Sequence, residues 1–455
     1  MILDIKNILD KKHTIRWVFL HILIGILSSQ NKYIFIIYFY LFIAINLKYI
    51  ITDIKYNTYE NSILIISYLF GFELLNRIIK VSPYIPSEYT KYIGIVCWLF
   101  FAIRSKKSIY GFIMLICIFP AILYDFTGQI QSLDIVNNFL APVSLSLSII
   151  FFGKLNPKND LLDNSMKLIW FALVSTLFSM IIRSPSYDDM SFSLQSNESA
   201  SGGTSSNQAS TILGLGIFLS FYSFYKKKHF SGYTYLDLFF ASIFLLQGLL
   251  TFSRGGIFVA IISIFVFLIL SSYSAESKYK NLKYPGFIFN FLYISLGFLF
   301  IVSTFLIVDN ITKGALSLRY KGETAGTITG TAEKNIDKIT SGRSEIFLED
   351  ISVWLQYPIT GVGVGGSRYA RGNLIAPHIE LSRLLADHGI LGMIFFILLT
   401  LLGVIIYLNR KIIPNSDLLM ALYVLGYLSS FHASMRTFVT PFFVGISAIS
   451  LNVKK

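Results

Sequence analysis

Long apolar runs alternate with short polar stretches along almost the whole chain. Fourteen runs can be counted, at residues 15–29, 33–47, 61–79, 90–103, 108–124, 135–153, 167–183, 209–225, 235–252, 255–272, 286–308, 389–408, 416–432 and 437–452. A helix needs roughly 20 apolar residues to cross a hydrocarbon core of ~30 Å, and somewhat fewer where flanking charges reach the interface. Because the runs lack the alternation of barrel strands, they predict membrane-spanning helices. The first, fourth and last runs are short, so we expect about 12–14 spans.

Composition supports the same fold class, because 54% of the residues are hydrophobic and only 14% are charged. We therefore predict an all-α, polytopic membrane protein that forms a single integral membrane domain over residues 1–455. The first run lacks a small-residue cleavage site and is followed at once by another run, so no cleavable signal peptide is expected. Cys97 and Cys117 lie in separate runs, which argues against a disulfide or a cysteine-based metal site.

The net charge of +13 follows a topological pattern. Lysine and arginine concentrate in alternate loops, at Lys11, Lys12 and Arg16; Lys48 and Lys55; Arg104, Lys106 and Lys107; Lys154 and Lys158; Lys226, Lys227 and Lys228; Lys278, Lys280 and Lys283; Arg410 and Lys411; and Lys454 and Lys455. The positive-inside rule assigns these loops to the cytoplasm. No basic stripe suited to nucleic acid is present, so that partner is not expected.

Two polar segments fall on the opposite, outward side. The smaller covers residues 184–208 and the larger residues 309–388, which hold nine basic and nine acidic residues. Because the larger segment interrupts an otherwise apolar chain, we expect the chemistry there.

Residues 344–356 of the larger segment predict an amphipathic helix. Phe347, Ile351, Trp354 and Leu355 share one face, with Glu345, Glu349 and Asp350 elsewhere. Arg343 precedes this helix, where the helix dipole disfavours a cation. It is either a solvated loop residue or part of an anion-binding site.

A glycine run follows Pro358 and contains Gly361, Gly363, Gly365, Gly366 and Gly372, with Ser367, Arg368 and Arg371 between them. Such a run can turn tightly and present backbone N–H groups to a phosphate. It can equally be a flexible turn that returns the chain to the membrane. Gly363, Gly365 and Arg368 are candidate substrate-binding residues.

Pro377 and His378 open a predicted helix that ends at Gly389. A histidine in the first helical turn is kept neutral by the helix dipole, so His378 suits the role of a general base. A histidine satisfied by water or backbone is the alternative. Glu380 and Arg383, three positions apart, are expected to pair on the helix surface.

Arg254 lies between two runs on the outward side. It either reaches from the bilayer to the interface or binds a diphosphate with its planar guanidinium. Arg436, with His432, is a weaker candidate of the same kind in the last outward turn.

These motifs occur in an order that resembles the O-antigen ligase and polymerase superfamily. They are Ser253-Arg254-Gly255-Gly256, Ser341-Gly342-Arg343 with Trp354, Gly361-Val362-Gly363-Val364-Gly365, and Pro377-His378 followed by His388-Gly389-Ile390-Leu391-Gly392. The resemblance covers residues 205–410 and implies a fold like that of the GT-C glycosyltransferases. It also implies catalysis by His378, diphosphate binding by Arg254 and Arg343, and a substrate-binding role for Asn207. Two departures are Ile379, where many members carry asparagine, and His388, where a carboxylate is common.

The resemblance implies an inverting transfer on the periplasmic face of a bacterial inner membrane. The donor would be an undecaprenyl-diphosphate-linked glycan, and the acceptor a hydroxyl of a lipid-linked repeat unit or of lipid A core. No cofactor or metal is expected, because outward Asp-x-Asp pairs are absent from the sequence and arginines can stabilise the leaving diphosphate.

Polymerisation of O-antigen or another surface polysaccharide is favoured over ligation to lipopolysaccharide core, and a polymerase would have a chain-length regulator as a further partner. A lipid-linked glycan transporter or flippase is the alternative from a different class. A purely structural scaffold is the third.

Overall fold

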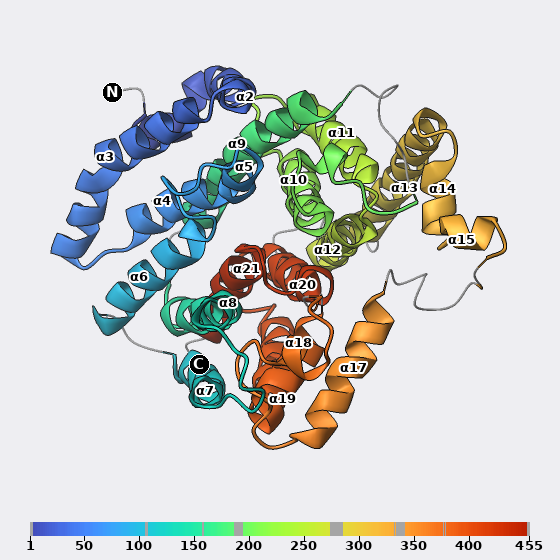
Figure 1. The fold of residues 1–455 in the computed structure, drawn as a ribbon. Coiled ribbons are helices and arrows are strands. Elements are labelled where there is room, and N and C mark those ends of the chain that lie inside the picture. The colour runs from blue at the N-terminus through green and yellow to red at the C-terminus, as the bar shows by residue number, and fades with distance from the viewer. Residues whose placement is uncertain are drawn as a thin grey trace. The chain divides into compact units, whose positions relative to one another are not determined.

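The computed structural model of this chain describes residues 3–104, 108–156, 159–185, 194–273, 285–331, 333, 342–375, 377 and 379–452. These residues form helices joined by turns and loops, with no strand among them (Figure 1). The predicted all-α class is therefore confirmed. Helices occupy all fourteen of the apolar runs, although the run at 61–79 is divided at Phe72 between α4 (Glu60–Gly71) and α5 (Glu73–Ile78).

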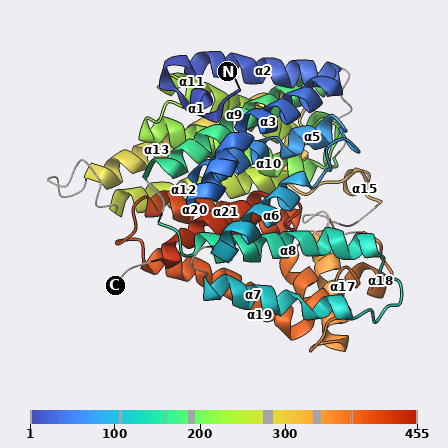
Figure 2. The same ribbon diagram turned by 90° about the vertical axis from the view of Figure 1, so that its left-hand side faces the viewer.

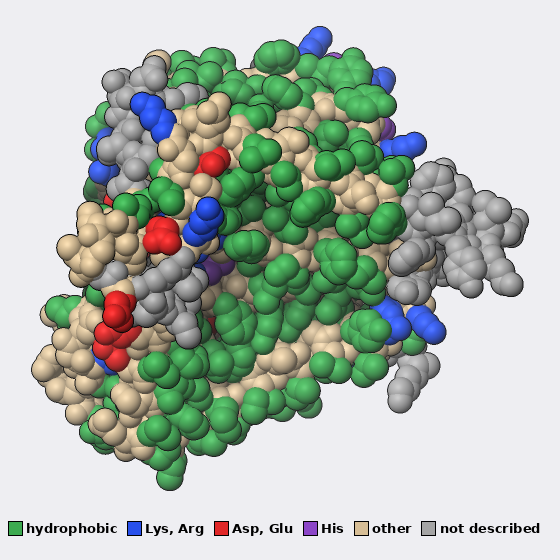
Figure 3. Space-filling model, turned by 90° about the vertical axis from the view of Figure 1, so that its right-hand side faces the viewer, with side chains coloured by type: hydrophobic (Ala, Val, Ile, Leu, Met, Phe, Trp, Pro, Cys, Tyr) green, Lys and Arg blue, Asp and Glu red, His purple; other side chains and the backbone are tan. Residues whose placement is uncertain are grey.

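Within the described residues, six helices are long and apolar enough to cross a bilayer. They are α3 (Lys32–Tyr56), α8 (Ser132–Phe152), α9 (Asn159–Arg183), α12 (Arg254–Tyr273), α13 (Pro285–Ile311) and α19 (Glu380–Leu408). Shorter apolar segments cover Ile109–Leu123, Thr234–Leu250 and Val439–Leu451. Large apolar side chains of α13 are exposed, and Figure 3 shows a face on which hydrophobic side chains cover a wide area. Surface of this kind suits contact with lipid.

The chain divides into two compact units, each built from separate stretches of sequence. Unit 1 comprises Met1–Ile93, Pro157–Ile264 and Ile294–Leu316, and unit 2 comprises Gly94–Asn156, Phe265–Tyr293 and Ser317–Lys455. Four helices contribute residues to both units: α6 (Tyr89–Arg104), α12, α13 and α14 (Ala315–Tyr320). The expectation of one membrane domain over residues 1–455 stays a prediction.

Helix α9 is the centre of unit 1. Against it pack α1 (Ile5–Leu9), α2 (Thr14–Gln30), α4, α5, η3 (Ser199–Ser201), α10 (Ser206–Lys226) and α11 (Thr234–Leu250), whereas α3 packs on α2 and α4, and η1 (Lys11–His13) on α2. Because α9 is apolar on all sides, it is buried along most of its length. Its Trp170 also donates a hydrogen bond of 2.8 Å to the Ser220 hydroxyl of α10, which satisfies the buried indole N–H.

Helix α19 is the centre of unit 2. The unit contains α7 (Ile109–Ile118), η2 (Pro120–Leu123), α8, α15 (Ala325–Ile328), α17 (Arg343–Gln356), α18 (Ser367–Ala370), α20 (Ser416–Ala433), α21 (Val439–Ser447) and η4 (Ala448–Leu451). Figure 2 shows α7, α8 and α19 side by side, and α17 and α18 pack on α19. Gly389 breaks α19 with φ 61° and ψ −138°, at the predicted end of the 378–389 helix. That helix begins at Glu380 and not at His378, and the chain continues beyond Gly389 as an apolar helix.

Candidate functional site

The sequence-predicted residues fall in both units. Asn207 and Arg254 belong to unit 1, whereas Arg343, Gly363, Gly365, Arg368 and Arg436 belong to unit 2. His378, the predicted base, lies outside the described residues, but its neighbours Pro377 and Ile379 are described.

In unit 1 the structure brings Asn207 next to the Ser-Arg-Gly-Gly segment. The Ser253 hydroxyl donates to Asn207 Oδ1 over 3.0 Å and lies 2.9 Å from the Ser210 hydroxyl. Gly256 packs so closely on α10 that an added Cβ would lie 2.0 Å from the Ser210 carbonyl oxygen. Arg254 is the first residue of α12 and is half-buried. The motif therefore places Ser253, the residue before Arg254, in contact with Asn207 where α12 packs closely on α10.

In unit 2 the glycine loop, residues 361–367, has all of its backbone N–H groups bound by protein acceptors. Gly361 donates to the Tyr357 carbonyl, Val362 to Ala386, Gly363 to Asp387, Val364 to Ala121 and Gly366 to Gly363. Gly365 and Ser367 each donate over 3.0 Å to one oxygen of the Asp387 side chain. The amides of Gly363 and Gly365 are thus engaged within the protein and are not directed at an outside phosphate.

Asp387 organises this loop from the first segment of α19. Its buried carboxylate also accepts from Arg383 Nη1 over 3.1 Å, and Arg383 Nε donates to Glu380 Oε2 over 3.2 Å. The Glu380–Arg383 pair predicted from the sequence is confirmed, but the prediction that it lies on the helix surface is wrong. Arg383 is 4% exposed and Glu380 1%, so both side chains are buried. A buried pair with a third charged partner is far more costly to break than a surface pair.

Glycine is required in the loop by geometry. Gly361 has φ 67°, and a Cβ there would lie 2.4 Å from the backbone carbon of Asp387. The loop therefore packs directly on the backbone of α19 beside the Gly389 break. A structural role of this kind accounts for the glycine run without a ligand.

Arg368, a candidate substrate-binding residue, binds a protein carboxylate. Its Nη2 donates to Asp134 at the start of α8, and the Tyr369 hydroxyl donates to the same carboxylate over 2.7 Å. Arg368 thereby ties α18 to α8. The contact leaves its side chain 28% exposed.

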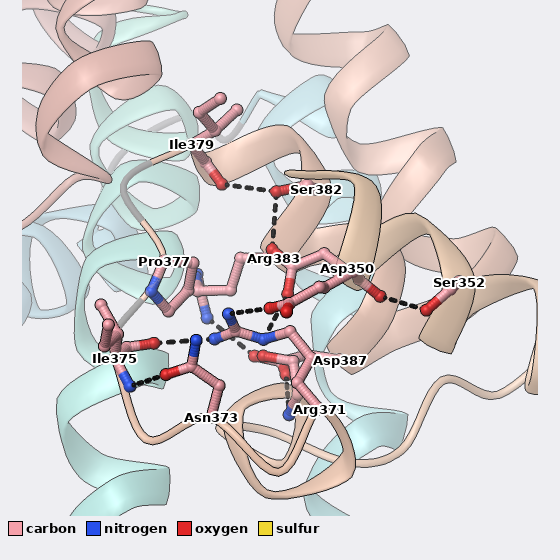
Figure 4. A network of polar contacts seen from close by, with 12 residues as sticks. Asp350, Ser352, Arg371, Asn373, Ile375, Pro377, Ile379, Ser382, Arg383 and Asp387 are labelled. Atoms are coloured by element: carbon pink, nitrogen blue, oxygen red, sulfur yellow. Dashed lines mark hydrogen bonds and ion pairs between the residues drawn. The ribbon is translucent and has the colours of Figure 1, made fainter. Parts of the chain in front are cut away.

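Figure 4 shows a cluster of charged and polar side chains that connects α17, the loop after α18 and α19. We call Asp350, Arg371 and Ser382 the Asp350 cluster. Asp350 Oδ1 lies 3.0 Å from Arg371 Nε, an ion pair without the alignment of a hydrogen bond, and Asp350 Oδ2 accepts from Ser382 over 2.7 Å. Both charged side chains are fully buried. Burial raises the pKa of the Asp350 carboxyl to about 6, although Ser382 and the charge of Arg371 act in the other direction.

The chain on either side of His378 is held by side chains from several elements. Arg371 Nη2 donates to the Ile375 carbonyl over 2.8 Å, and Arg436 Nη2 donates to the Pro377 carbonyl over 2.9 Å. The Ile379 carbonyl accepts from the Arg383 amide and lies 3.3 Å from the Ser382 hydroxyl. Arg436, predicted to contact substrate, is therefore seen to fix the residue that precedes His378.

The predicted amphipathic helix is present as α17, with one correction to its faces. Asp350 is buried together with Ile346 and Val353, whereas Leu355, predicted on the apolar face, is 67% exposed. The prediction was wrong because it treated every carboxylate as outward. Asp350 faces inward because Arg371 and Ser382 satisfy it there.

Arg343 begins α17, directly after Gly342, which has φ 79°. Its side chain is half-buried. Trp354, eleven positions later, donates its indole N–H to the Pro358 carbonyl over 3.2 Å. The tryptophan of the motif thus closes the turn that leads from α17 into the glycine loop.

Sequence reasoning overlooked the residues that hold this region together. Asp350, Ser382 and Asp387 received no role, and Arg371 was noted only as part of the glycine run. One signal was available, because Asp350 is spaced four residues after Ile346 and three before Val353. That spacing places it on the same helix face as two aliphatic residues.

Comparisons of this chain with known protein families, with curated proteins and with solved structures found no match.

Proposed function

We propose that this protein is a polytopic glycosyltransferase of the bacterial inner membrane with 12–14 spans and a GT-C-like fold. It moves a glycan from undecaprenyl diphosphate to an acceptor sugar hydroxyl on the periplasmic face. The observation that supports the proposal is the set of hydrogen bonds to the described residues on either side of His378. The carbonyl of Ile375 accepts a hydrogen bond from Arg371, and the carbonyl of Pro377 accepts one from Arg436. The Ile379 carbonyl accepts one from the Arg383 amide in the first turn of α19.

A catalytic base must be held in place to act on a bound hydroxyl. In the proposed step, the acceptor oxygen forms a bond to the anomeric carbon from the side opposite the diphosphate. The glycosidic C–O bond breaks, and its electron pair leaves with undecaprenyl diphosphate. His378 takes the acceptor proton, and Arg254 and Arg343 stabilise the charge that develops on the leaving diphosphate. This step requires no resident metal.

The order of the motifs and the two polar outward segments support polymerisation of O-antigen or another surface-polysaccharide repeat unit, with the next lipid-linked repeat unit as acceptor. A chain-length regulator would be a natural partner. The large segment is helical in its described part, with α14, α15, α17 and α18 between α13 and α19. Such a segment can form a structured cap over a membrane-boundary site.

The first prediction concerns His378→Ala. We expect glycan transfer by purified protein to fall about 10²–10⁴-fold, the usual loss for a general base, with normal abundance and membrane insertion. Arg254→Ala and Arg343→Ala should reduce transfer by a similar factor, and the matching lysine variants should recover part of it. His13→Ala, on the predicted cytoplasmic side, is the matched control. Full transfer by His378→Ala would remove the proposed base.

A gel of surface glycans from a deletion strain separates the related functions. Single-repeat products support the polymerase, whereas long chains retained on the lipid carrier indicate a ligase. Loss of every surface glycan, with repeat units trapped on the cytoplasmic side, would support a transporter and contradict the transferase.

A further inference from the structure

Unit 1 contains a cavity that no part of the proposed transfer uses. Its volume is about 920 Å³, and five lysines and two aspartates line it: Lys11, Lys167, Lys226, Lys227, Lys228, Asp160 and Asp163. We call it the lysine pocket. No candidate residue for glycan transfer is among its lining residues.

Lys167 is the feature that distinguishes this pocket from a solvated basic surface. Its side chain lies on α9 and is only 7% exposed. Its ammonium group donates one hydrogen bond, of 3.2 Å, to the Thr14 hydroxyl. Asp10 and Asp237 act favourably on its charge, and the Phe171 ring lies below it at 5.6 Å, but among the described residues it forms no ion pair. A buried ammonium has three donors and a large desolvation cost, so a nearby anion would stabilise it.

The two aspartates of the pocket offset only part of the charge of its five lysines. Asp163 is already bound by Lys228 over 2.6 Å and by the Tyr222 hydroxyl. Asp160 is exposed at the start of α9. The lysines therefore leave an excess of positive charge in the pocket.

The helix ends around the pocket add to this field. Thr14 begins α2, Asp160 lies in the first turn of α9, and Thr234 begins α11, so three long helices direct their N-termini toward it. The positive ends of helix dipoles favour anions. Only one helix, α10, directs its C-terminus toward the pocket, at Lys226, and its dipole acts in the opposite direction.

We propose that the lysine pocket binds a phosphate group. Lysine clusters at helix N-termini suit phosphate, and Lys167 would donate to it from the interior side. An anionic phospholipid headgroup and a soluble phosphate compound share this chemistry. The lipid is favoured because the pocket lies where four apolar helices end, with Tyr233 and Tyr235 exposed beside it in the manner of interfacial aromatic residues.

Binding to delipidated full-length protein in detergent tests the proposal. The probes are phosphatidylglycerol, phosphatidylcholine and inorganic phosphate, and the readouts are native mass spectrometry and the shift in Tm. We expect phosphatidylglycerol to bind more tightly than phosphatidylcholine, and Lys167→Met to weaken it at least about tenfold. Lys55→Met, an exposed lysine outside the pocket, is the matched control and should bind as the wild type does.

Comparison of the three probes distinguishes a lipid headgroup from a soluble phosphate compound. Preference for phosphatidylglycerol identifies the lipid, and equal saturation by inorganic phosphate identifies a soluble ligand. If Lys167→Met does not fold, the same binding measurements are made on Lys11→Met and Lys227→Met, which replace two other lysines of the pocket. The proposal would be overturned if these variants bound phosphatidylglycerol and inorganic phosphate as tightly as the wild type. It would also be overturned if the wild type bound neither probe.

Discussion

Asp350 is a buried carboxylate that is linked through Arg371 to the described residue Ile375. It pairs with Arg371, and Arg371 holds the Ile375 carbonyl. Asp387 and Arg383 are the other charged groups that act on it. Because burial raises its pKa to about 6, a change of pH within an ordinary experimental range alters the charge of this cluster.

The sign of the resulting pH dependence follows from proton binding. Between pH 3.8 and about 6, the folded state binds the Asp350 proton and the unfolded state has released it. The contribution of Asp350 to stability is therefore present below this window and is lost as pH rises through it, at no more than about 1.4 kcal/mol per pH unit. We expect Asp350→Asn to lose less stability than the wild type between pH 4.5 and 7, as measured by Tm in detergent. Parallel curves for the two proteins would contradict this assignment.

Sequence reasoning located several important residues without their contacts. The apolar pattern marked the region around Arg343 and His378, because polar residues there interrupt the membrane runs. It could not show that Arg436 binds the Pro377 carbonyl or that Arg368 binds Asp134, since these partners lie 59 and 234 positions apart. Long-range pairs of this kind are decided by tertiary packing and leave no periodic signal.

The glycine loop and α19 behave as one structural element. The loop binds the carbonyls of Ala386 and Asp387 just before the Gly389 break, and the Ile390 amide returns a hydrogen bond to the Ile359 carbonyl over 3.3 Å. Rigid attachment at both sides of the break fixes the direction of the first segment of α19. The loop therefore fixes the first segment of α19, which begins at Glu380.

Two glycines of nearly equal φ test this role. Gly361 and Gly372 have φ 67° and 68°, but a Cβ would meet the Asp387 backbone at Gly361 and nothing within 4 Å at Gly372. We expect Gly372→Ala to cost about 1–2 kcal/mol, the strain of a left-handed alanine. Gly361→Ala should cost at least about twice as much, because the backbone must also move. Equal losses of Tm would show that the loop does not pack tightly on α19.

Helix positions were largely predictable, because apolar runs of membrane-span length favour one backbone geometry. The stop at Gly389 was also predictable from a glycine at the end of a periodic segment. The break at Phe72 was not predicted, although Gly71 directly precedes it, because a single glycine inside an apolar run is also compatible with a continuous helix.

At the scale of the whole molecule, the charge distribution predicts which loops face the cytoplasm. Unit 1 supports part of this pattern: Lys11, Lys167 and Lys226–Lys228 line one cavity, and Lys48 pairs with Asp4 near the N-terminus over 2.8 Å. Helices whose charged ends gather in this way are expected to share a membrane side. The division of the chain into two units could not be predicted, because each unit combines distant stretches of sequence.

Cysteine labelling tests the topology. In a background with Cys97→Ser and Cys117→Ser, Ser352→Cys on α17 and Lys227→Cys after α10 place one exposed thiol on each predicted side. We expect a membrane-impermeant maleimide to label Ser352→Cys in intact spheroplasts, and Lys227→Cys only after permeabilisation. Labelling in the reverse order would invert the topology and move the large polar segment to the cytoplasm.

Every backbone amide of the glycine loop already forms a hydrogen bond within the protein, which affects the entropy cost of binding the sugar in the proposed function. The conformational entropy of this loop is lost when the protein folds, so no further ordering of it opposes association. Amide hydrogens of Gly365 and Ser367 should then exchange slowly with deuterated water even when no glycan is present, because Asp387 already occupies them.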